Sequence, residues 1–310
     1  MTCLLLYNPK AGKGRCESEV SAIVEVFRSE GIDLHPRAIV FGTDPFDGAE
    51  DVALVVVAGG DGTINYVVNC MERRGINPRL GIIPRGTAND FAHVLGMPSN
   101  PLEAARQIAR GGKKTRAVGE QVTTVGEEAT AVREHCVDCG EVNGRRFVNV
   151  FSFGVLTTTS QQTSDRAKHR FGKLAYLWVG AKDLARMHPM ELVITSDGER
   201  QSVRAAMLLV FNGRSAGRFR LAPKAQVDDG MFDVVVLDYR NMVAACWAMI
   251  RYLAGCKPKA VRTFRCRTLR IETQRPEPTD VDGQQGPEFP IELRCLPQIL
   301  RIQGAKPRGR

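Results

Sequence analysis

The sequence predicts a chain of two domains: an α/β domain with a parallel sheet, then a domain of antiparallel strands. Three observations favour this fold class. The 310 residues are about twice the length of a usual single domain. From Cys3 to about Ala117, apolar strand-like segments alternate with segments of helical periodicity. After about Val118, strand-like segments come in pairs around tight-turn dipeptides. We therefore expect domains at residues 1–117 and 118–310, with residues 119–134 as a surface insertion.

The first domain is expected to consist of β–α units. Its predicted strands are residues 3–7, 37–41, 52–58 and 80–83. Residues 52–58 are apolar throughout, as in a parallel strand that is covered on both faces. Helical spacing of apolar residues predicts helices over residues 16–30, 64–71 and 102–110. Thr87 is expected to cap a further helix that carries Phe91.

The second domain is expected to be built mainly from hairpins. Asn143-Gly144 and Asp197-Gly198 are typical tight-turn dipeptides, and each separates two strand-like segments. The predicted strands are residues 136–142, 145–153, 191–195, 201–211, 232–237, 264–273 and 291–302. Two helices, over residues 174–186 and 242–253, are expected to interrupt them.

Composition narrows the choice of partner and compartment. The net charge of +9 favours polyanions, but aromatic residues make up only 6% and no basic tract is interleaved with them, so we expect no nucleic-acid partner. The longest apolar runs, residues 53–58 and 207–211, are far shorter than a membrane span. The N-terminus has no basic segment and soon reaches a turn at Asn8-Pro9, which argues against a signal peptide. Nine scattered cysteines suit a reducing cytoplasm.

Three glycine-containing turns follow predicted strands of the first domain, at residues 8–15, 59–65 and 84–91. Ligands of open parallel sheets bind at the carboxyl ends of the strands, so the three turns could meet in one cleft. The first turn lacks the Walker A spacing and could equally be an ordinary strand-to-helix turn. The second places Asp61 among three glycines, a pattern that favours phosphate binding, although Asn65 breaks the dinucleotide fingerprint.

Together these turns resemble the diacylglycerol-kinase catalytic domain of bacterial lipid kinases and sphingosine kinases. Residues 8–14 are similar to that family's first nucleotide loop, residues 59–65 to its G-G-D-G-T signature, and residues 86–91 to its G-T-x-N-D-F segment. Further landmarks of the bacterial members have counterparts in the second half of the chain, at residues 153–154, 172–176, 212–213, 228–233 and 282–283.

The resemblance implies phosphoryl transfer from ATP, with Mg²⁺, to a lipid hydroxyl such as that of diacylglycerol. It also implies a second domain similar to a β-sandwich. The implied ATP-binding residues are Asn8, Thr43, Gly59, Gly60, Asp61, Gly62, Thr63, Ile64, Asn65 and Thr87. Asp61 would lie beside the phosphates and metal, and Lys13 or Arg85 could offset phosphate charge. The implied ligands of a structural Mg²⁺ are Gln226, Asp229 and Met231, the first and last through backbone oxygens.

Position 284 departs from the family pattern. Gln284 stands where the family usually has a glutamate that accepts the proton of the lipid hydroxyl, and glutamine cannot do so. Asp282, Asp61 or Glu288 could take the proton instead. The implied catalytic residues are thus Asp61, Asp282 and position 284. A second departure is the short segment 43–52, where the family usually fits a helix.

Alternatives remain open at this point. Gln284 leaves room for a catalytically silent nucleotide or lipid sensor, and NAD kinase shares the G-G-D-G-T signature. A basic cluster at residues 166–173 could rest on an anionic membrane, so we expect a cytoplasmic protein peripheral to the inner membrane face. Exposed strand edges could pair two copies into a homodimer. Cys136 and Cys139 are interpreted as strand cysteines, in preference to zinc ligands.

Overall fold

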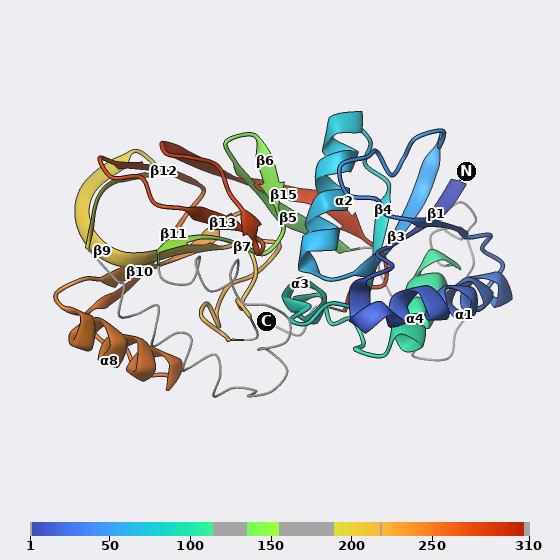
Figure 1. The fold of residues 1–310 in the computed structure, drawn as a ribbon, viewed down its shortest axis with the longest axis horizontal. Coiled ribbons are helices and arrows are strands. Elements are labelled where there is room, and N and C mark those ends of the chain that lie inside the picture. The colour runs from blue at the N-terminus through green and yellow to red at the C-terminus, as the bar shows by residue number, and fades with distance from the viewer. Residues whose placement is uncertain (1, 114–134, 155–188, 218, 307–310) are drawn as a thin grey trace, which may run out of the picture. The chain divides into compact units, whose positions relative to one another are not determined.

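A computed structural model describes residues 2–113, 135–154, 189–217 and 219–306 (Figure 1). The chain divides into two compact units, one of residues 1–137 with 298–310, the other of residues 138–297. This division differs from the predicted boundary at 117/118, because the C-terminal residues return to the first unit. The predicted insertion at 119–134 and the predicted helix at 174–186 lie outside the described residues.

The first unit contains a parallel sheet, as the apolar pattern predicts. Its strands β1 (Thr2–Tyr7), β2 (His35–Ala38), β3 (Val52–Gly59) and β4 (Arg79–Pro84) lie in the order β2-β1-β3-β4. All three neighbouring pairs are parallel. Val55, Val56 and Val57 are fully buried, as expected for a central parallel strand. The end of β15 (Ile291–Ile302) adds a further parallel pairing, between Ile302 and Leu80.

Helices follow the strands of this unit. They are the 3-10 helix η1 (Ala11–Gly14), α1 (Arg15–Ser29), α2 (Asp61–Arg74), α3 (Asp90–Val94) and α4 (Pro101–Lys113). Several predicted bounds are wrong, and helix α2, for example, covers Asp61–Arg74 in place of the predicted 64–71. Strand β2 ends at Ala38, before the predicted 41, and leaves Val40 and Phe41 exposed in a loop. Helix α4 continues through Gly111 and Gly112, beyond the predicted end at 110, because its buried face packs against α1 and β4.

The second unit is built from antiparallel strand pairs, nine of which lie within its described residues. Its elements are β5 (His135–Val142), β6 (Arg145–Phe147), β7 (Val150–Gly154), β8 (Met190–Ser196), β9 (Glu199–Phe211), β10 (Phe232–Asp238), α8 (Met242–Leu253), β11 (Val261–Cys266), β12 (Thr268–Thr273), β13 (Thr279–Val281), β14 (Gln284–Gln285) and most of β15. The two predicted hairpins form β5–β6 and β8–β9, and α8 occupies the predicted range.

Two predicted strands are each divided in the structure. The predicted strand 145–153 is divided into β6 and β7, because backbone N–H groups of residues 148–150 bind the Asp282 carboxylate. The predicted strand 264–273 is divided into β11 and β12, where the N–H groups of Arg267 and Thr268 bind the Asp197 carboxylate. In both cases, N–H groups of the interrupted segment bond a side chain from a distant turn.

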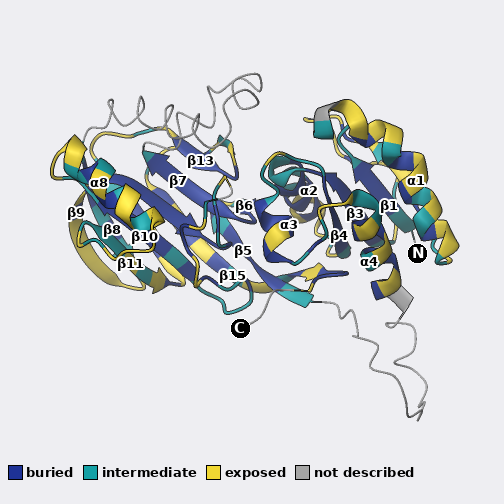
Figure 2. Ribbon diagram, turned by 90° about the horizontal axis from the view of Figure 1, so that it is seen from below, coloured by how far each residue is buried: buried dark blue, intermediate teal, exposed yellow. Residues whose placement is uncertain are grey.

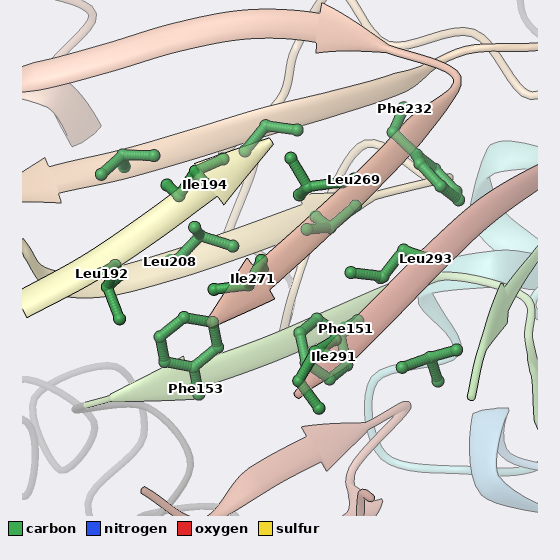
Figure 3. Close-up of a cluster of buried hydrophobic side chains, with 14 of the residues drawn as sticks. Phe151, Phe153, Leu192, Ile194, Leu208, Phe232, Leu269, Ile271, Ile291 and Leu293 are labelled. Atoms are coloured by element: carbon green, nitrogen blue, oxygen red, sulfur yellow. The ribbon is translucent and has the colours of Figure 1, made fainter. Parts of the chain in front are cut away.

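Strand β9 is buried on both faces in its second half, and this divides the core of the second unit in two. One face, with Leu208 and Val210, joins a cluster that includes Phe151, Ile194 and Ile271 (Figure 3). The other face, with Met207, Leu209 and Phe211, joins a second cluster, to which α8 contributes Ala245 and Ala248. Figure 2 shows the buried strands in dark blue and the exposed positions of α8 in yellow.

Candidate active site

The three glycine-containing turns of the first unit lie against one another, as expected for the carboxyl ends of a parallel sheet. The N–H of Arg85, after β4, donates a 2.8 Å hydrogen bond to the carbonyl of Gly59, after β3. The side-chain amide of Asn8, after β1, donates a 3.3 Å hydrogen bond to the Thr63 hydroxyl. Asn8, the second turn and the third turn therefore surround one region of the surface of this unit.

Gly60 and Gly86 allow the second and third turns to approach closely. A Cβ atom on Gly86 would lie 2.5 Å from the Cα of Gly60, which no side chain tolerates. Gly12 has a φ of +61°, and a Cβ there would lie 3.1 Å from the guanidinium of Arg85. Glycine is thus required at positions 60 and 86, where the two backbones touch. The first turn packs directly on Arg85.

Asp61 binds the start of helix α3. Its two carboxylate oxygens accept hydrogen bonds of 3.1 and 3.0 Å from the N–H groups of Asp90 and Phe91. The residue before this helix, Asn89, has a φ of 53° and no side-chain capping bond. Thr87 is exposed, and the prediction that it caps the helix is wrong. Asp61 performs this function from 29 residues earlier in the chain.

Asn89 closes the third turn with a second pair of bonds. Its side-chain oxygen accepts a 2.7 Å hydrogen bond from the N–H of Gly86, and its side-chain amide donates a 2.8 Å bond to the Gly86 carbonyl. The sequence analysis did not select Asn89 as a site residue. An Asn three residues after a glycine is the only sequence signal for this contact, and it is common in turns.

The other residues predicted in the second turn belong to the first turns of α2. The N–H groups of Thr63 and Ile64 donate to the Gly60 carbonyl at 2.9 and 3.1 Å. Thr63, Ile64 and Asn65 are at most 4% exposed, so their side chains lie in the interior. This segment therefore presents backbone and the positive end of a 14-residue helix, an arrangement that attracts phosphate.

Thr43 lies in the loop after β2, and α2 holds that loop. The Thr43 hydroxyl donates a 2.8 Å hydrogen bond to the Val40 carbonyl. Tyr66, on α2, donates through its hydroxyl to the Thr43 carbonyl and accepts a 3.1 Å bond from the N–H of Gly42. The ring of Phe41 packs edge-on against Tyr66, with centroids 5.0 Å apart. Phe41 remains 51% exposed and offers an aromatic face beside Thr43.

Arg85 is already paired with an acidic residue. Its guanidinium lies 2.6 Å from the carboxylate of Glu19 on α1, and its side chain is only 14% exposed. The pair links the third turn to the helix that follows the first turn. Arg85 thus positions the two turns relative to each other, and its charge is already partly offset by Glu19.

In the second unit, Asp282 is 7% exposed and has a φ of 50°. Its carboxylate accepts bonds of 2.7, 3.0 and 2.8 Å from the N–H groups of Val148, Asn149 and Val150. A carboxylate that accepts hydrogen bonds from several backbone donors is held in one orientation. Its contacts therefore give Asp282 a positioning role between β6 and β7, which the sequence analysis did not foresee.

Gln284 is partly exposed and bonded to Arg145. The Arg145 guanidinium donates a 2.5 Å hydrogen bond to the side-chain oxygen of Gln284 and a 2.7 Å bond to the carbonyl of Gln285. A glutamate at position 284 would form an ion pair with this arginine. Sequence reasoning missed Arg145 because it lies 139 residues away in the chain.

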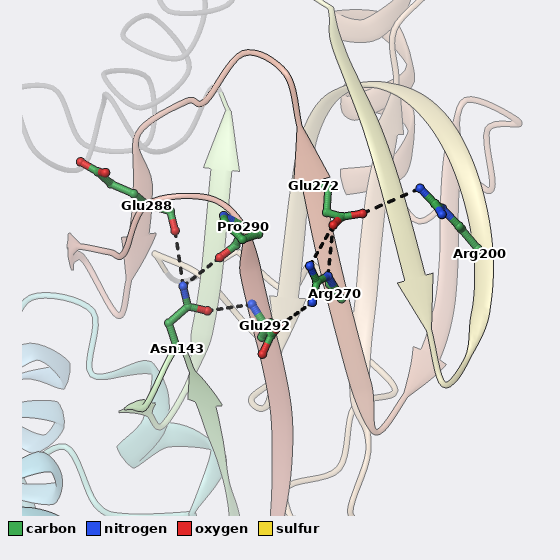
Figure 4. Close-up of polar contacts among 7 residues, drawn as sticks. All are labelled: Asn143, Arg200, Arg270, Glu272, Glu288, Pro290 and Glu292. Atoms are coloured by element: carbon green, nitrogen blue, oxygen red, sulfur yellow. Dashed lines mark hydrogen bonds and ion pairs between the residues drawn. The ribbon is translucent and has the colours of Figure 1, made fainter.

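Glu288, the third alternative for the proton acceptor, adjoins a polar network on the surface of the same unit (Figure 4). The Asn143 side chain donates to the carbonyls of Glu288 and Pro290 at 3.4 and 2.9 Å and accepts from the N–H of Glu292 at 2.7 Å. Only the backbone of Glu288 takes part, and its carboxylate points away in Figure 4. This network ties the β5–β6 turn to the start of β15.

The loop predicted to hold Mg²⁺ contains one carboxylate ligand, Asp229. It accepts a 3.1 Å bond from the N–H of Met231 and is ion-paired with Arg265. The loop is also held by buried Asp138, which accepts a 2.6 Å bond from the N–H of Gly230. Nearby, burial raises the pKa of the Asp233 carboxyl, an effect that Arg265 opposes.

The side chains of this loop do not make a Mg²⁺ site by themselves. Arg265 already neutralises Asp229, and Gln226 and Met231 are predicted to contribute only backbone oxygens. Across the described ranges, no cluster of three or more His, Cys, Asp or Glu side chains could hold a metal ion. Cys136 and Cys139 lie on β5, as predicted for strand cysteines, and burial raises the pKa of the Cys139 thiol.

Comparisons with known proteins agree with this architecture. Residues 2–121 match the family model of the diacylglycerol kinase catalytic domain, and residues 149–304 match that of the YegS C-terminal NAD kinase beta sandwich-like domain. The diacylglycerol kinase of Bacillus subtilis (strain 168) is 28% identical, with 96% of this chain and 94% of that protein covered. The diacylglycerol kinase of Staphylococcus carnosus (strain TM300) is 27% identical, with 97% and 94% covered.

Solved structures show the same fold. A crystal structure of a diacylglycerol kinase from Bacillus anthracis str. Sterne has a TM-score of 0.72 at 24% identity and covers 99% of this chain and 97% of its own. Another structure from this strain has a TM-score of 0.78 at 25% identity, with 99% and 95% covered.

The two family matches and the observed fold define the class of this protein. In this class a diacylglycerol-kinase catalytic domain precedes a β-sandwich domain. This chain belongs to that family, as the sequence resemblance indicates, and it is a kinase. Its second domain is the β-sandwich that the resemblance implies.

Proposed function

We propose that this protein transfers the γ-phosphoryl group of ATP to the hydroxyl of a lipid such as diacylglycerol. The main observation in support of this proposal is that the three glycine-containing turns lie against one another at the start of helix α2. Backbone N–H groups and the positive end of a helix favour a triphosphate there. The names of the relatives supply the acceptor class, since both are diacylglycerol kinases.

The nucleotide would lie along the turns that follow β1, β2, β3 and β4. Asn8, the segment from Gly59 to Asn65, and Thr87 would bind the phosphates and ribose, with Thr43 at the rim. Phe41 adds an exposed ring beside Thr43, on which a purine could stack. In this arrangement Asp61 holds the third turn in place by binding the N–H groups of α3.

In the reaction, the bond from the γ-phosphorus to the β,γ-bridging oxygen breaks and a bond to the lipid oxygen forms. The hydroxyl proton passes to solvent, and ADP departs with the bridging oxygen. Gln284 cannot accept that proton, and Asp282 is engaged by three backbone donors. Loss of a general base typically costs about 10²–10⁴-fold in rate. Phosphoryl transfer depends mainly on positioning and charge neutralisation, so a slow kinase is still expected.

We further propose that Mg²⁺ enters with ATP. Mg²⁺ commonly binds through substrate phosphates and one or two carboxylates, which needs no preformed protein cage. The structural site at Gln226, Asp229 and Met231 stays a prediction from resemblance, because Arg265 competes for Asp229.

A lipid acceptor suggests a protein peripheral to the inner face of the membrane, in the cytoplasm. No helix within the described ranges combines the length and apolar character needed to cross a bilayer. We also propose a homodimer that forms by pairing of exposed strand edges.

The test is incubation with γ-labelled ATP, Mg²⁺ and a panel of acceptors: diacylglycerol, ceramide, sphingosine, other lipid alcohols and NAD. We expect label on diacylglycerol or a related lipid. Label on NAD alone would show that the acceptor is a nucleotide and not a lipid.

A second candidate function rests on Gln284 and its bond to Arg145. The protein could bind ATP and lipid without transferring phosphate. Equilibrium binding of both ligands, together with no labelled product at high enzyme concentration, would favour this silent binding protein over the kinase.

A further inference from the structure

Helix α8 carries most of its large apolar side chains on its outer face. Exposed fractions are 72% for Val243, 61% for Trp247 and 51% for Ile250, with Met242 and Leu253 at 39% and 41%. These positions follow the i, i+4, i+7 spacing of one helical face. Arg251 is the only charged residue in the helix.

The fully buried residues of α8 are small, and Met249 and Tyr252 pack beside them against the same core cluster. Ala245 and Ala248, 1% and 4% exposed, pack on the core cluster of β9 and β10. Tyr252 anchors the helix through a 2.6 Å hydrogen bond from its hydroxyl to the Leu221 carbonyl. Surface helices normally place large apolar residues inward and charges outward. In α8 large apolar side chains also lie on the exposed face, and this face needs an apolar environment to cover it.

The surroundings of this face are positively charged. Residues 239–271 contain eight arginines and lysines and no aspartate or glutamate. Four of the eight are exposed: Arg251 lies in the last turn of the helix, and Arg240, Lys257 and Lys259 flank it. In the part of the chain that the structure describes, none of these four forms an ion pair with an acidic residue.

We propose that the outer face of α8 docks on an anionic lipid surface, with Val243, Trp247 and Ile250 inserted among the acyl chains. The positive charge around the helix favours an anionic membrane as the partner of this face, in preference to a second copy of this protein. Two identical basic faces repel each other, whereas anionic headgroups attract them. Tryptophan favours the boundary between headgroups and hydrocarbon, and an amphipathic helix lies flat there. Docking would bring the enzyme to a lipid acceptor, and only this role of the helix rests on the proposed function.

The direct test uses the fluorescence of Trp247 in the full chain. The protein has two tryptophans, so Trp178→Phe leaves Trp247 as the sole reporter. We expect a blue shift of its emission on vesicles of phosphatidylglycerol and phosphatidylcholine, and quenching by brominated acyl chains. Vesicles of phosphatidylcholine alone should give a much smaller shift, and added salt should weaken the effect. Unchanged emission on anionic vesicles would overturn the proposal.

Sedimentation with the same vesicles tests the face as a whole. The double variant Trp247→Gln with Ile250→Ser should lose about tenfold or more in vesicle affinity, because the inserted apolar area is removed. Arg240→Glu with Lys257→Glu should lose a similar amount at low salt. A matched control, Val40→Ser with Phe41→Ser, removes two large apolar residues that are exposed outside α8 and should bind vesicles as the wild type does. Wild-type binding by both α8 variants, or a change only in their oligomeric state by light scattering, would refute membrane docking.

A short-chain, water-soluble diacylglycerol separates this proposal from the proposed function. The α8 variants should phosphorylate it at the wild-type rate while losing activity on vesicle-borne diacylglycerol. If the wild type phosphorylates neither lipid, the proposed function fails, and the vesicle-binding result still decides whether α8 docks.

Discussion

At the scale of single residues, Asp61 illustrates how one side chain serves both fold and site. The resemblance implies a role beside the phosphates and metal, and the structure adds bonds to two N–H groups at the start of α3. These roles are compatible, because a carboxylate fixed by backbone donors keeps its charge and orientation. Substitution should therefore affect stability as well as turnover.

Asp61→Asn is expected to abolish most activity and to lower the melting temperature by about 2–8 °C. The asparagine directs an NH₂ group at one of the two backbone donors, which costs roughly 1–2 kcal/mol. Differential scanning calorimetry and the labelled-ATP assay measure the two effects. Asp47→Asn, at a side chain that is 91% exposed, is the matched control and should change neither. An unchanged melting temperature for Asp61→Asn would show that the α3 contacts contribute little.

Gln284 and Arg145 form the second pair of interest at this scale. Gln284→Glu should leave activity unchanged or raise it, but the Arg145 guanidinium would hold the new carboxylate ionised and weaken it as a base. The double variant Gln284→Glu with Arg145→Gln should therefore exceed Gln284→Glu in kcat. The single variant Arg145→Gln serves as the control for loss of the arginine. A large loss in Gln284→Glu alone would mean that the glutamine has its own role.

At the scale of elements, two Asp-Gly turns do more than reverse the chain. Asp197 and Asp282 both have positive φ, and each carboxylate binds N–H groups of a distant segment. For Asp197, burial acts to raise the pKa, but the hydrogen bonds from Thr268 and Arg267 outweigh it and lower the pKa. Turn residues here set where β7 and β12 begin.

Asp282→Asn should destabilise the second unit by roughly 3 kcal/mol, because three buried backbone donors lose an ionised acceptor. Asp197→Asn should cost less, since Asp197 is exposed. Urea denaturation monitored by circular dichroism measures both. Equal effects of the two substitutions would contradict the burial argument.

The Asp197 contribution should also depend on pH. A group whose pKa is lowered by folding stabilises the protein above its unfolded pKa of about 3.9 and loses that effect as the pH falls through the folded pKa. The stability difference between wild type and Asp197→Asn should thus be full at pH 7 and shrink below about pH 4. A difference that is constant from pH 7 to pH 3 would contradict this.

At the scale of the whole molecule, the last residues complete the first unit. Ile302 pairs with Leu80, and the N–H of Gln303 donates a 2.9 Å bond to the Leu80 carbonyl. The Gln303 side chain donates to the Ile108 carbonyl at 2.8 Å, and that of Gln107 to the Gly304 carbonyl at 2.6 Å. The first unit is therefore discontinuous in sequence.

A fragment of residues 1–137 should consequently fail to unfold cooperatively, because strand β4 loses a neighbour and buried polar groups on α4 lose partners. Fusing residues 298–306 to this fragment through a flexible linker should restore a cooperative urea transition. The same linker followed by a scrambled version of residues 298–306 is the control. Cooperative unfolding of residues 1–137 alone would show that the C-terminal strand is dispensable.

The sequence by itself determined the class of each domain, the ranges of α1, α8 and most strands, and the three turns of the site. Those features depend on residues a few positions apart, through apolar periodicity and turn-forming dipeptides. Only the tertiary structure decided that Asp61 caps α3, that Asp282 divides a strand, that Arg145 binds Gln284, and that residues 298–310 return to the first unit. Each of these contacts joins positions 29 or more residues apart, so it exists only once the path of the backbone has brought the two partners together.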